Sequence, residues 1–168
     1  MMSKSLIELL PLCGTIITAL FGLWQYKQIR FSDTVISARK EYLREFRYYS
    51  TQFCISTEKL LNPSKDVEID KSNQLVFAYR LKFMLNPFDY VGCWDGEIIR
   101  LIDNLLETPN DKRLQQLTAL LQSVFILEWK GITKEGIRGF LGKKSKEKLR
   151  IEVYDKYVIY CKNKNIYG

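Results

Sequence analysis

LLPLCGTIITALFGLWQY, residues 9–26, is an unbroken run without a charged side chain, bounded by Glu8 and Lys27. Its 18 residues would rise about 27 Å as an α-helix, close to the thickness of the hydrocarbon layer of a bilayer. A buried helix of a globular domain normally has one polar side, and this run has none. The run therefore predicts a membrane-spanning helix, with a buried core helix as the alternative.

The flanks of the run predict its orientation. Trp24 and Tyr26 stand at its C-terminal end, and amphipathic rings favour the headgroup region of a bilayer. Only Lys4 precedes the run, whereas several basic residues follow it: Lys27, Arg30, Arg39, Lys40 and Arg44. The positive-inside rule then places the N-terminus outside and the rest of the chain in the cytoplasm. Residues 21–24, Phe-Gly-Leu-Trp, are a poor site for signal cleavage, so we expect the span to be retained.

The small side chains of the run gather on one side of the expected helix. At 100° per residue they fall within an arc of about 140°, and they are Gly14, Thr15, Thr18, Ala19 and Gly22. Helices associate in lipid by close backbone approach across small residues. We therefore expect this small face to pack against another copy of the chain. A ring of copies could line a pore with Thr15 and Thr18, and the alternative is a monomeric anchor.

A long amphipathic helix is expected after the span, over residues 29–61. Its apolar residues recur every three or four positions, at Phe31, Val35, Ala38, Tyr42, Phe46, Tyr49 and Phe53. The basic residues of this region could form a collar beneath the bilayer, made of Lys27, Arg30, Arg39, Lys40, Arg44 and Arg47. The ordinary positive-inside bias explains the same residues without a collar.

The rest of the chain predicts a cytoplasmic helical bundle. Helices are expected at 74–85, 97–106, 111–130 and 145–162, with Gly131 ending the third. Their expected apolar sides are Leu75, Phe77, Ala78, Leu81 and Leu85 in the first helix, Ile98, Leu101, Ile102 and Leu105 in the second, Leu114, Leu117, Leu121, Val124, Phe125 and Leu127 in the third, and Leu149, Val153, Tyr157, Tyr160 and Cys161 in the fourth. A polar connector at 62–73 and an aromatic-rich turn at 87–96 separate the first of these helices from its neighbours. The predicted class is all-α, and the predicted domains are a transmembrane anchor (1–28), a membrane-proximal helix (29–61) and the bundle (74–168).

Composition excludes several kinds of chemistry. The chain has no histidine, which removes the commonest general base and every histidine–metal site. Its four cysteines form no C-x-x-C pair. Asp95, Glu97 and Asp103 are interpreted as acids near a helix start rather than as a catalytic pair. We therefore expect no enzyme activity, no metal, no cofactor and no small-molecule substrate.

Two further segments have the composition of phosphate-binding sites. The glycines of residues 131–145 lack the strand and the hydroxyl residue of a phosphate loop, so a hinge between helices is the better interpretation. A basic stretch could bind nucleic-acid phosphates or anionic lipid, or be solvated; it contains Lys143, Lys144, Lys146, Lys148 and Arg150. The net charge of +7 fits all of these partners.

The order of these features resembles a known family. A span with a small face, a basic exit at Lys27 and Arg30, a long helix and a compact helical bundle are similar to the small membrane accessory protein of type VI-B CRISPR systems, which accompanies an RNA-guided RNA nuclease. The resemblance covers nearly the whole chain in architecture and length. Residues 85–87 and 127–130 are also similar to uncharacterised bacterial single-span defence proteins.

The resemblance implies a ring-forming protein that depolarises the bacterial inner membrane, with an RNA-guided nuclease or RNA as a partner. This family is associated with HEPN ribonucleases, whose active sites have a histidine several residues after an arginine. In this chain Arg150 has Asp155 at the position where such a histidine would stand, so we do not expect ribonuclease activity.

The expected function is that of a homo-oligomeric inner-membrane effector of antiviral defence that forms a pore or alters membrane permeability. The alternative is a membrane-tethered module that binds nucleic acid or a protein. A divergent HEPN-like ribonuclease ranks third.

Overall fold

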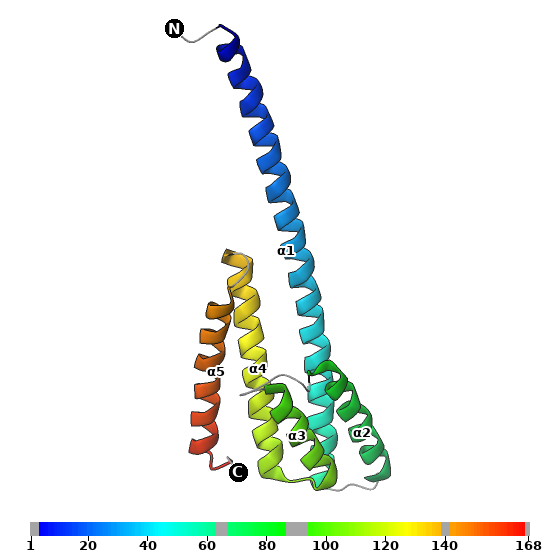
Figure 1. The fold of residues 1–168 in the computed structure, drawn as a ribbon. Helices are drawn as coiled ribbons and strands as arrows, with labels where there is room; N and C mark the ends of the chain where they lie inside the picture. The colour runs from blue at the N-terminus through cyan, green and yellow to red at the C-terminus, as the bar shows by residue number, and fades with distance from the viewer. Residues whose placement is uncertain (1–3, 63–66, 87–93, 139–141, 167–168) are drawn as a thin grey trace. The chain divides into compact units, whose positions relative to one another are not determined.

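The computed structural model describes residues 4–62, 67–86, 94–138 and 142–166. Within these ranges the side chains of some helical residues lie outside the described ones, namely 4–10, 12, 27, 28, 31, 32, 67–70 and 136–138. The described residues form five α-helices and no strand (Figure 1): α1 Lys4–Leu61, α2 Val67–Met84, α3 Trp94–Glu107, α4 Asp111–Arg138 and α5 Lys143–Asn163. The predicted all-α class is confirmed.

The longest helix, α1, includes both the predicted span and the predicted membrane-proximal helix. Pro11 lies inside α1, which continues past it although proline offers no backbone N–H to the helix. The chain divides into two compact units, residues 1–39 and 40–168, so α1 contributes to both. The sequence placed boundaries after residues 28 and 61, whereas the compact helical unit begins at Lys40.

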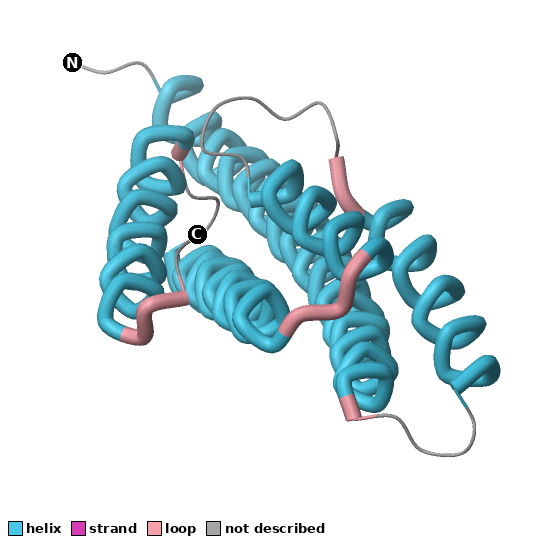
Figure 2. The backbone as a smooth tube through the Cα atoms, turned by 90° about the horizontal axis from the view of Figure 1, so that it is seen from below, coloured by secondary structure: helices cyan, strands magenta, loops and turns pink. Residues whose placement is uncertain are grey.

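Within residues 40–168, α4 packs against both α3 and α5, and α2 packs against α3 (Figures 1 and 2). Each of these helices contributes apolar side chains at three- and four-residue spacings, which places them on one side of a helix. The buried set includes Ile98, Leu101, Ile102 and Leu105 of α3, Leu117, Leu120 and Leu121 of α4, and Leu149, Val153, Tyr157 and Cys161 of α5. These periods correspond to those expected from the sequence.

The C-terminal third of α1 belongs to this core. Phe46 and Phe53 are 1% and 0% exposed, and the intervening Ser50 is also buried. The Phe46 ring lies 5.5 Å from the ring of Phe125 of α4, measured between centroids. Burying one such side chain stabilises a fold by about 1.5–3 kcal/mol. The spacing of three and four residues between these positions explains why the helical unit begins within α1.

A hydrogen-bond chain joins α1, α2 and α3 inside the core. The Gln74 side-chain amide donates to the Thr57 hydroxyl at 2.9 Å, and its distance to the Leu105 carbonyl oxygen is 3.5 Å. The Thr57 hydroxyl donates in turn to the Phe53 carbonyl at 2.8 Å. Gln74 and Thr57 are both buried, so each satisfies a polar group that water does not reach.

The transmembrane part of the predicted fold is not supported by the described residues. Among them, no helix combines the length with the apolar character that crossing a bilayer requires. Three leucines of the predicted span, Leu9, Leu10 and Leu12, have side chains outside the described ones.

Several predicted helix boundaries differ from the structure. Helix α2 begins at Val67, inside the predicted connector. The sequence did not predict these first turns because the polar residues Lys71, Ser72 and Asn73, which are exposed, interrupt the apolar period. Gly131 does not end α4, because the buried side continues through Ile132 and Glu135. This packing outweighs the roughly 1 kcal/mol cost of a glycine in a helix. The predicted turn at 87–96 lies partly outside the described residues, and its described part, 94–96, is wrong because it forms the start of α3. The predicted hinge at 131–145 is helical over 131–138 and 143–145, and residues 139–141 lie outside the described ones.

Replacing Gln74 by alanine should lower the free energy of unfolding by about 1–3 kcal/mol, because the Thr57 hydroxyl oxygen then loses its buried donor. Urea denaturation of the purified chain in neutral detergent measures this change. Gln115→Ala, at an exposed position of α4, is the matched control and should stay within about 0.5 kcal/mol of the wild type. Equal effects of the two substitutions would contradict the assignment.

Candidate functional site

The small face predicted in residues 9–26 is open in the structure. Gly14, Thr15, Thr18, Ala19 and Gly22 are all exposed. A Cβ atom built at Gly14 or Gly22 meets no atom within 4 Å. The Thr18 hydroxyl donates to the Gly14 carbonyl at 2.8 Å, so its proton is satisfied within its own helix and its oxygen can still accept. The face therefore presents small groups and little unsatisfied polarity.

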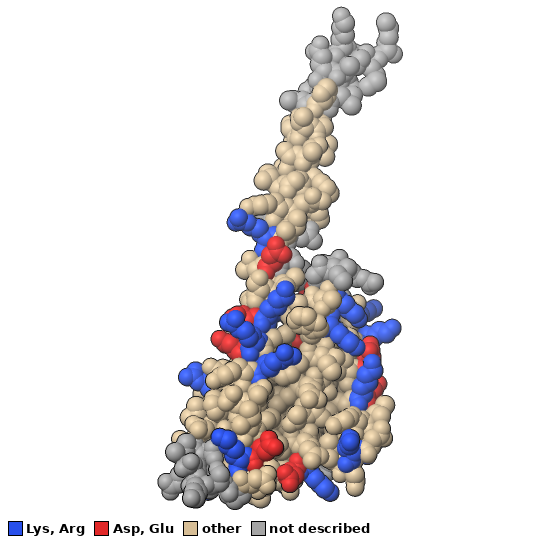
Figure 3. Space-filling view, turned by 180° about the vertical axis from the view of Figure 1, so that it is seen from behind, with Lys and Arg blue, Asp and Glu red and all other residues tan. Residues whose placement is uncertain are grey.

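The remaining sides of this segment present bulky apolar side chains. Their exposed fractions range from 51% to 65%, and the residues are Ile16, Ile17, Leu20, Phe21, Leu23 and Trp24. On the face drawn in Figure 3, this part of α1 shows no charged side chain, whereas Lys, Arg, Asp and Glu are mixed over the helical unit. Water-exposed apolar surface of this extent is unusual for a protein without a covering partner.

The C-terminal end of the segment carries an aromatic and basic pair. The Arg30 guanidinium carbon lies 5.1 Å from the centroid of the Tyr26 ring, within the range of a cation–π interaction. The Phe21 and Trp24 rings lie 5.9 Å apart, one turn earlier. This order of rings and then a cation is typical of helices that enter a headgroup region.

The six residues of the predicted basic collar fall into different parts of the structure. The side chain of Lys27 lies outside the described ones, and Arg30 and Arg39 belong to the unit of residues 1–39. Lys40, Arg44 and Arg47 belong to the helical unit, where all three line one groove between α1 and α4. Three of the six predicted residues therefore line one groove of the helical unit.

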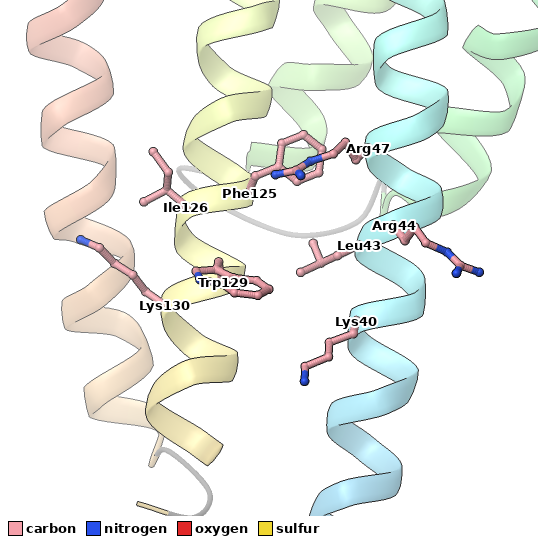
Figure 4. A pocket seen from close by; sticks show the side chains of 8 residues that line it. All are labelled: Lys40, Leu43, Arg44, Arg47, Phe125, Ile126, Trp129 and Lys130. Atoms are coloured by element: carbon pink, nitrogen blue, oxygen red, sulfur yellow. The ribbon is translucent and has the colours of Figure 1, made fainter. Parts of the chain in front are cut away.

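This groove, called here the α1–α4 groove, has an apolar floor. It encloses about 560 Å³ between Lys40, Leu43, Arg44 and Arg47 of α1 and Phe125, Ile126, Trp129 and Lys130 of α4. Figure 4 shows Trp129 and Leu43 facing each other across it, with Lys40 projecting into the opening. Trp129 is 61% exposed and Ile126 is 50% exposed. The groove therefore leaves large apolar side chains open to solvent.

The cations of the groove differ in their surroundings. The Arg47 guanidinium carbon lies 5.2 Å from the centroid of the Phe125 ring, which it covers. Arg44 points away from α4 and pairs with Glu41. Lys130 Nζ pairs with Glu152 Oε1 of α5 at 3.2 Å. Lys40 and Arg47 are therefore the two cations that face the groove.

A second hollow extends the α1–α4 groove along the same two helices. It has a volume of about 540 Å³ and shares Arg47, Phe125 and Ile126 with the first. Its other lining residues are mostly polar: Ser50, Thr51, Cys54, Ile55, Glu58, Thr118, Leu121 and Gln122. The Ser50 hydroxyl oxygen is buried and has no hydrogen-bond partner among the described residues.

The sequence did not predict the α4 wall of the groove. The apolar period of α4 placed Phe125 among the inward residues and gave Trp129 no role. The signal that could have found this wall is the pair Ile126 and Trp129, apolar residues three positions apart and off the core side of α4.

The acids and bases singled out in the sequence have separate partners. Asp95 Oδ2 accepts a hydrogen bond from the Asn86 backbone N–H at 2.9 Å, and Asp103 pairs with Lys82. Lys146 Nζ lies 2.9 Å from Glu135 Oε1, and Lys146 is exposed, as are Lys143, Lys144 and Lys148. Within the described residues, no group of three cysteines or carboxylates is placed to bind a metal ion.

Glu97 lies in a buried polar cluster rather than in an acid pair. The Tyr157 hydroxyl donates to Glu97 Oε1 at 3.1 Å, and the Gln116 amide nitrogen lies 3.5 Å from both. Burial raises the pKa of Tyr157 far above its ordinary value of 10.0, and the Glu97 carboxylate adds to the increase while Gln116 opposes it. The cluster joins α3, α4 and α5 and has the character of a structural contact.

Comparison with protein-family models, curated proteins and solved structures found no match to this chain.

The Tyr157 cluster makes stability depend on pH in the alkaline range. Because its pKa is higher in the folded than in the unfolded chain, its contribution is complete below about pH 10 and is lost as the pH rises further. The free energy of unfolding should then fall by up to about 1.4 kcal/mol per pH unit from this group. Tyr157→Phe should flatten that dependence in denaturation measured between about pH 9 and 11. An equal fall in the free energy of unfolding with pH in the wild type and in Tyr157→Phe would contradict this role of Tyr157.

Proposed function

We propose that residues 9–26 anchor this protein in a membrane. The observation that carries the proposal is the set of bulky apolar side chains around α1 that are more than half exposed from Ile16 to Trp24. A helix that is apolar on all sides needs an apolar surrounding. The Thr18–Gly14 hydrogen bond supports the same conclusion, because it satisfies a hydroxyl proton that hydrocarbon could not.

The proposed topology has one span, with the N-terminus outside and the helical unit in the cytoplasm. The Tyr26–Arg30 pair at the end of the segment supports it, since rings and cations favour the headgroup region. Further basic residues follow the proposed span on its cytoplasmic side, namely Arg39, Lys40, Arg44 and Arg47. Placement in a bacterial inner membrane follows from the resemblance to single-span defence proteins.

The small face supports self-association of the anchor. Gly14, Thr18 and Gly22 are spaced four residues apart, and the space beside both glycines is open. Such a stripe allows two helix backbones to approach closely in lipid, where packing drives association. We infer a homo-oligomeric defence effector that alters membrane permeability, the activity that the resemblance implies.

A membrane-tethered binding module is the second candidate, and the α1–α4 groove favours it. Exposed Trp129 and Ile126 beside Lys40 and Arg47 form an amphipathic surface on the helical unit. In this case the anchor supplies location, and the groove supplies the activity. The two candidates share the membrane anchor and differ in whether association of the span is essential.

Replacing Gly14, Thr18 and Gly22 together by leucine should abolish self-association while retaining the anchor, because the bulky side chains keep the helix backbones apart. Crosslinking in membranes, a wash in alkaline carbonate and dye entry into expressing cells measure association, anchoring and permeability. Oligomer and dye entry should be lost, whereas the protein should stay in the washed membrane pellet.

The control for this experiment is I16L/L20I/L23I, which alters the bulky side at constant volume and should behave as wild type. If the variant with leucine at positions 14, 18 and 22 gives the same crosslinked species as the wild type, self-association through the small face is contradicted. Loss of the oligomer with unchanged dye entry would reject the permeability effector in favour of the tethered module. Wild-type protein released by carbonate would overturn the anchor itself.

A further inference from the structure

The α1–α4 groove and its extension form one continuous surface on the helical unit. Along α1 their lining residues run from Lys40 to Glu58, a rise of about 27 Å at 1.5 Å per residue. Along α4 they run from Thr118 to Lys130. Two neighbouring helices with an open channel between them offer the place of a third helix, as in a helical bundle.

The apolar residues of this surface lie on both walls. Leu43 and Ile55 come from α1, and Ile126 and Trp129 come from α4. Three of the four are between 41% and 61% exposed. An apolar stripe of a helix recurs every three or four residues, so it can contact both walls along the channel. The pattern is that of a helix docked in a groove.

The charges of the groove specify the partner further. Lys40 and Arg47 face the channel, and they are seven residues apart on one helix, which corresponds to two turns or about 10 Å. Two carboxylates spaced by two turns of a docked helix would match Lys40 and Arg47. An apolar residue of the docked helix, between these two carboxylates, would then lie between Leu43 and Trp129. Glu58 lies at the other end of the channel, so the partner there needs a neutral or basic side chain.

Other occupants fit these residues less well. A lipid with an anionic head near Lys40 would direct its acyl chain toward the carboxylate of Glu58 at the far end of the channel. Single-stranded nucleic acid binds on successive exposed rings. Here Trp129 offers one such ring, while the Phe125 ring is covered by Arg47. Charge and polarity together favour a peptide helix.

We propose that the α1–α4 groove is a docking site for an acidic amphipathic helix of a partner protein. The helix lays its apolar stripe over Leu43, Ile126 and Trp129 and directs carboxylates to Lys40 and Arg47. The proposal concerns the helical unit and does not depend on association of the anchor.

The test uses the full chain in neutral detergent and fluorescein-labelled synthetic helices of about 18 residues, the length of the groove. A small set of these peptides carries a leucine stripe in different phases, glutamates spaced by seven positions beside it, and one lysine near the end that meets Glu58. Fluorescence anisotropy measures binding. At least one stripe peptide should bind, and a scrambled peptide of equal composition should not.

The K40E/R47E variant should bind the glutamate peptide at least roughly tenfold more weakly, because like charges then meet. A peptide with lysines in place of the two glutamates should recover binding to this variant. K143E/K144E, which makes the same change of charge on exposed residues of α5, should bind the glutamate peptide as wild type does. Trp129→Ala should weaken binding of the glutamate peptide without loss of helical circular dichroism, which separates loss of the apolar groove floor from unfolding.

Several results would overturn the proposal. These are no binding by any stripe peptide, equal binding of the scrambled peptide, equal weakening by K143E/K144E, or no recovery with the lysine peptide. Oligouridine or phosphatidylglycerol vesicles that bind the wild type more tightly than the peptides do, and lose affinity in K40E/R47E, would assign the groove to nucleic acid or to lipid instead. Failure of the anchor in carbonate extraction would leave the groove result standing.

Discussion

The structure depends on where one helix buries its apolar surface. Helix α1 carries apolar side chains along most of its length, and among its described side chains the buried ones lie from Phe46 onward. There, Phe46 contacts Phe125, and Thr57 connects to Gln74 of the next helix. These contacts make the C-terminal third of α1 a member of the helical unit, and the same helix carries exposed bulky apolar side chains from Ile16 to Trp24.

The two parts of α1 thus have different requirements. In the helical unit, an apolar side and a polar side separate core from water, as in other amphipathic helices. Residues 9–26 have no polar side, so water is a poor surrounding for every orientation of the segment. A bilayer would cover the bulky residues, and a second copy would cover the small face. The proposed function follows from these two unmet requirements rather than from a catalytic group.

Local patterns predicted much of the fold. The periods of α3 and α5 predicted most of their buried residues, from Ile98 to Leu105 and from Leu149 to Cys161, because an amphipathic period directly records which side is buried. Tyr160 was also expected on the apolar side and is 49% exposed. Leu75 was expected inside and is 45% exposed, because α2 packs on α3 through Ala78, Leu81 and Leu85. The continuation of α4 past Gly131 depends on the burial of Ile132 and Glu135, which the period did not contain, and the start of α2 has no apolar period from which to predict it.

The groove could not be predicted for a related reason. Lys40, Arg44 and Arg47 were identified as a basic group from their own helix, where they are neighbours by spacing. Trp129 and Ile126 belong to a helix more than 70 residues later in the chain, and only the pairing of α1 with α4 brings the two groups together. A pattern along one helix shows which side is apolar but not which helix will lie beside it.

The thiol of Cys13 gives the most direct test of the membrane anchor. It is exposed and lies within residues 9–26, whereas burial raises the pKa of the Cys54 and Cys161 thiols and slows their reaction. Sealed vesicles containing the wild-type chain are treated with a membrane-impermeant maleimide, and modified cysteines are mapped by mass spectrometry. A lipid-covered helix predicts that Cys13 stays unmodified until the protein is denatured. Modification of Cys13 in intact vesicles as fast as that of an added surface thiol, Lys143→Cys, would contradict the anchor.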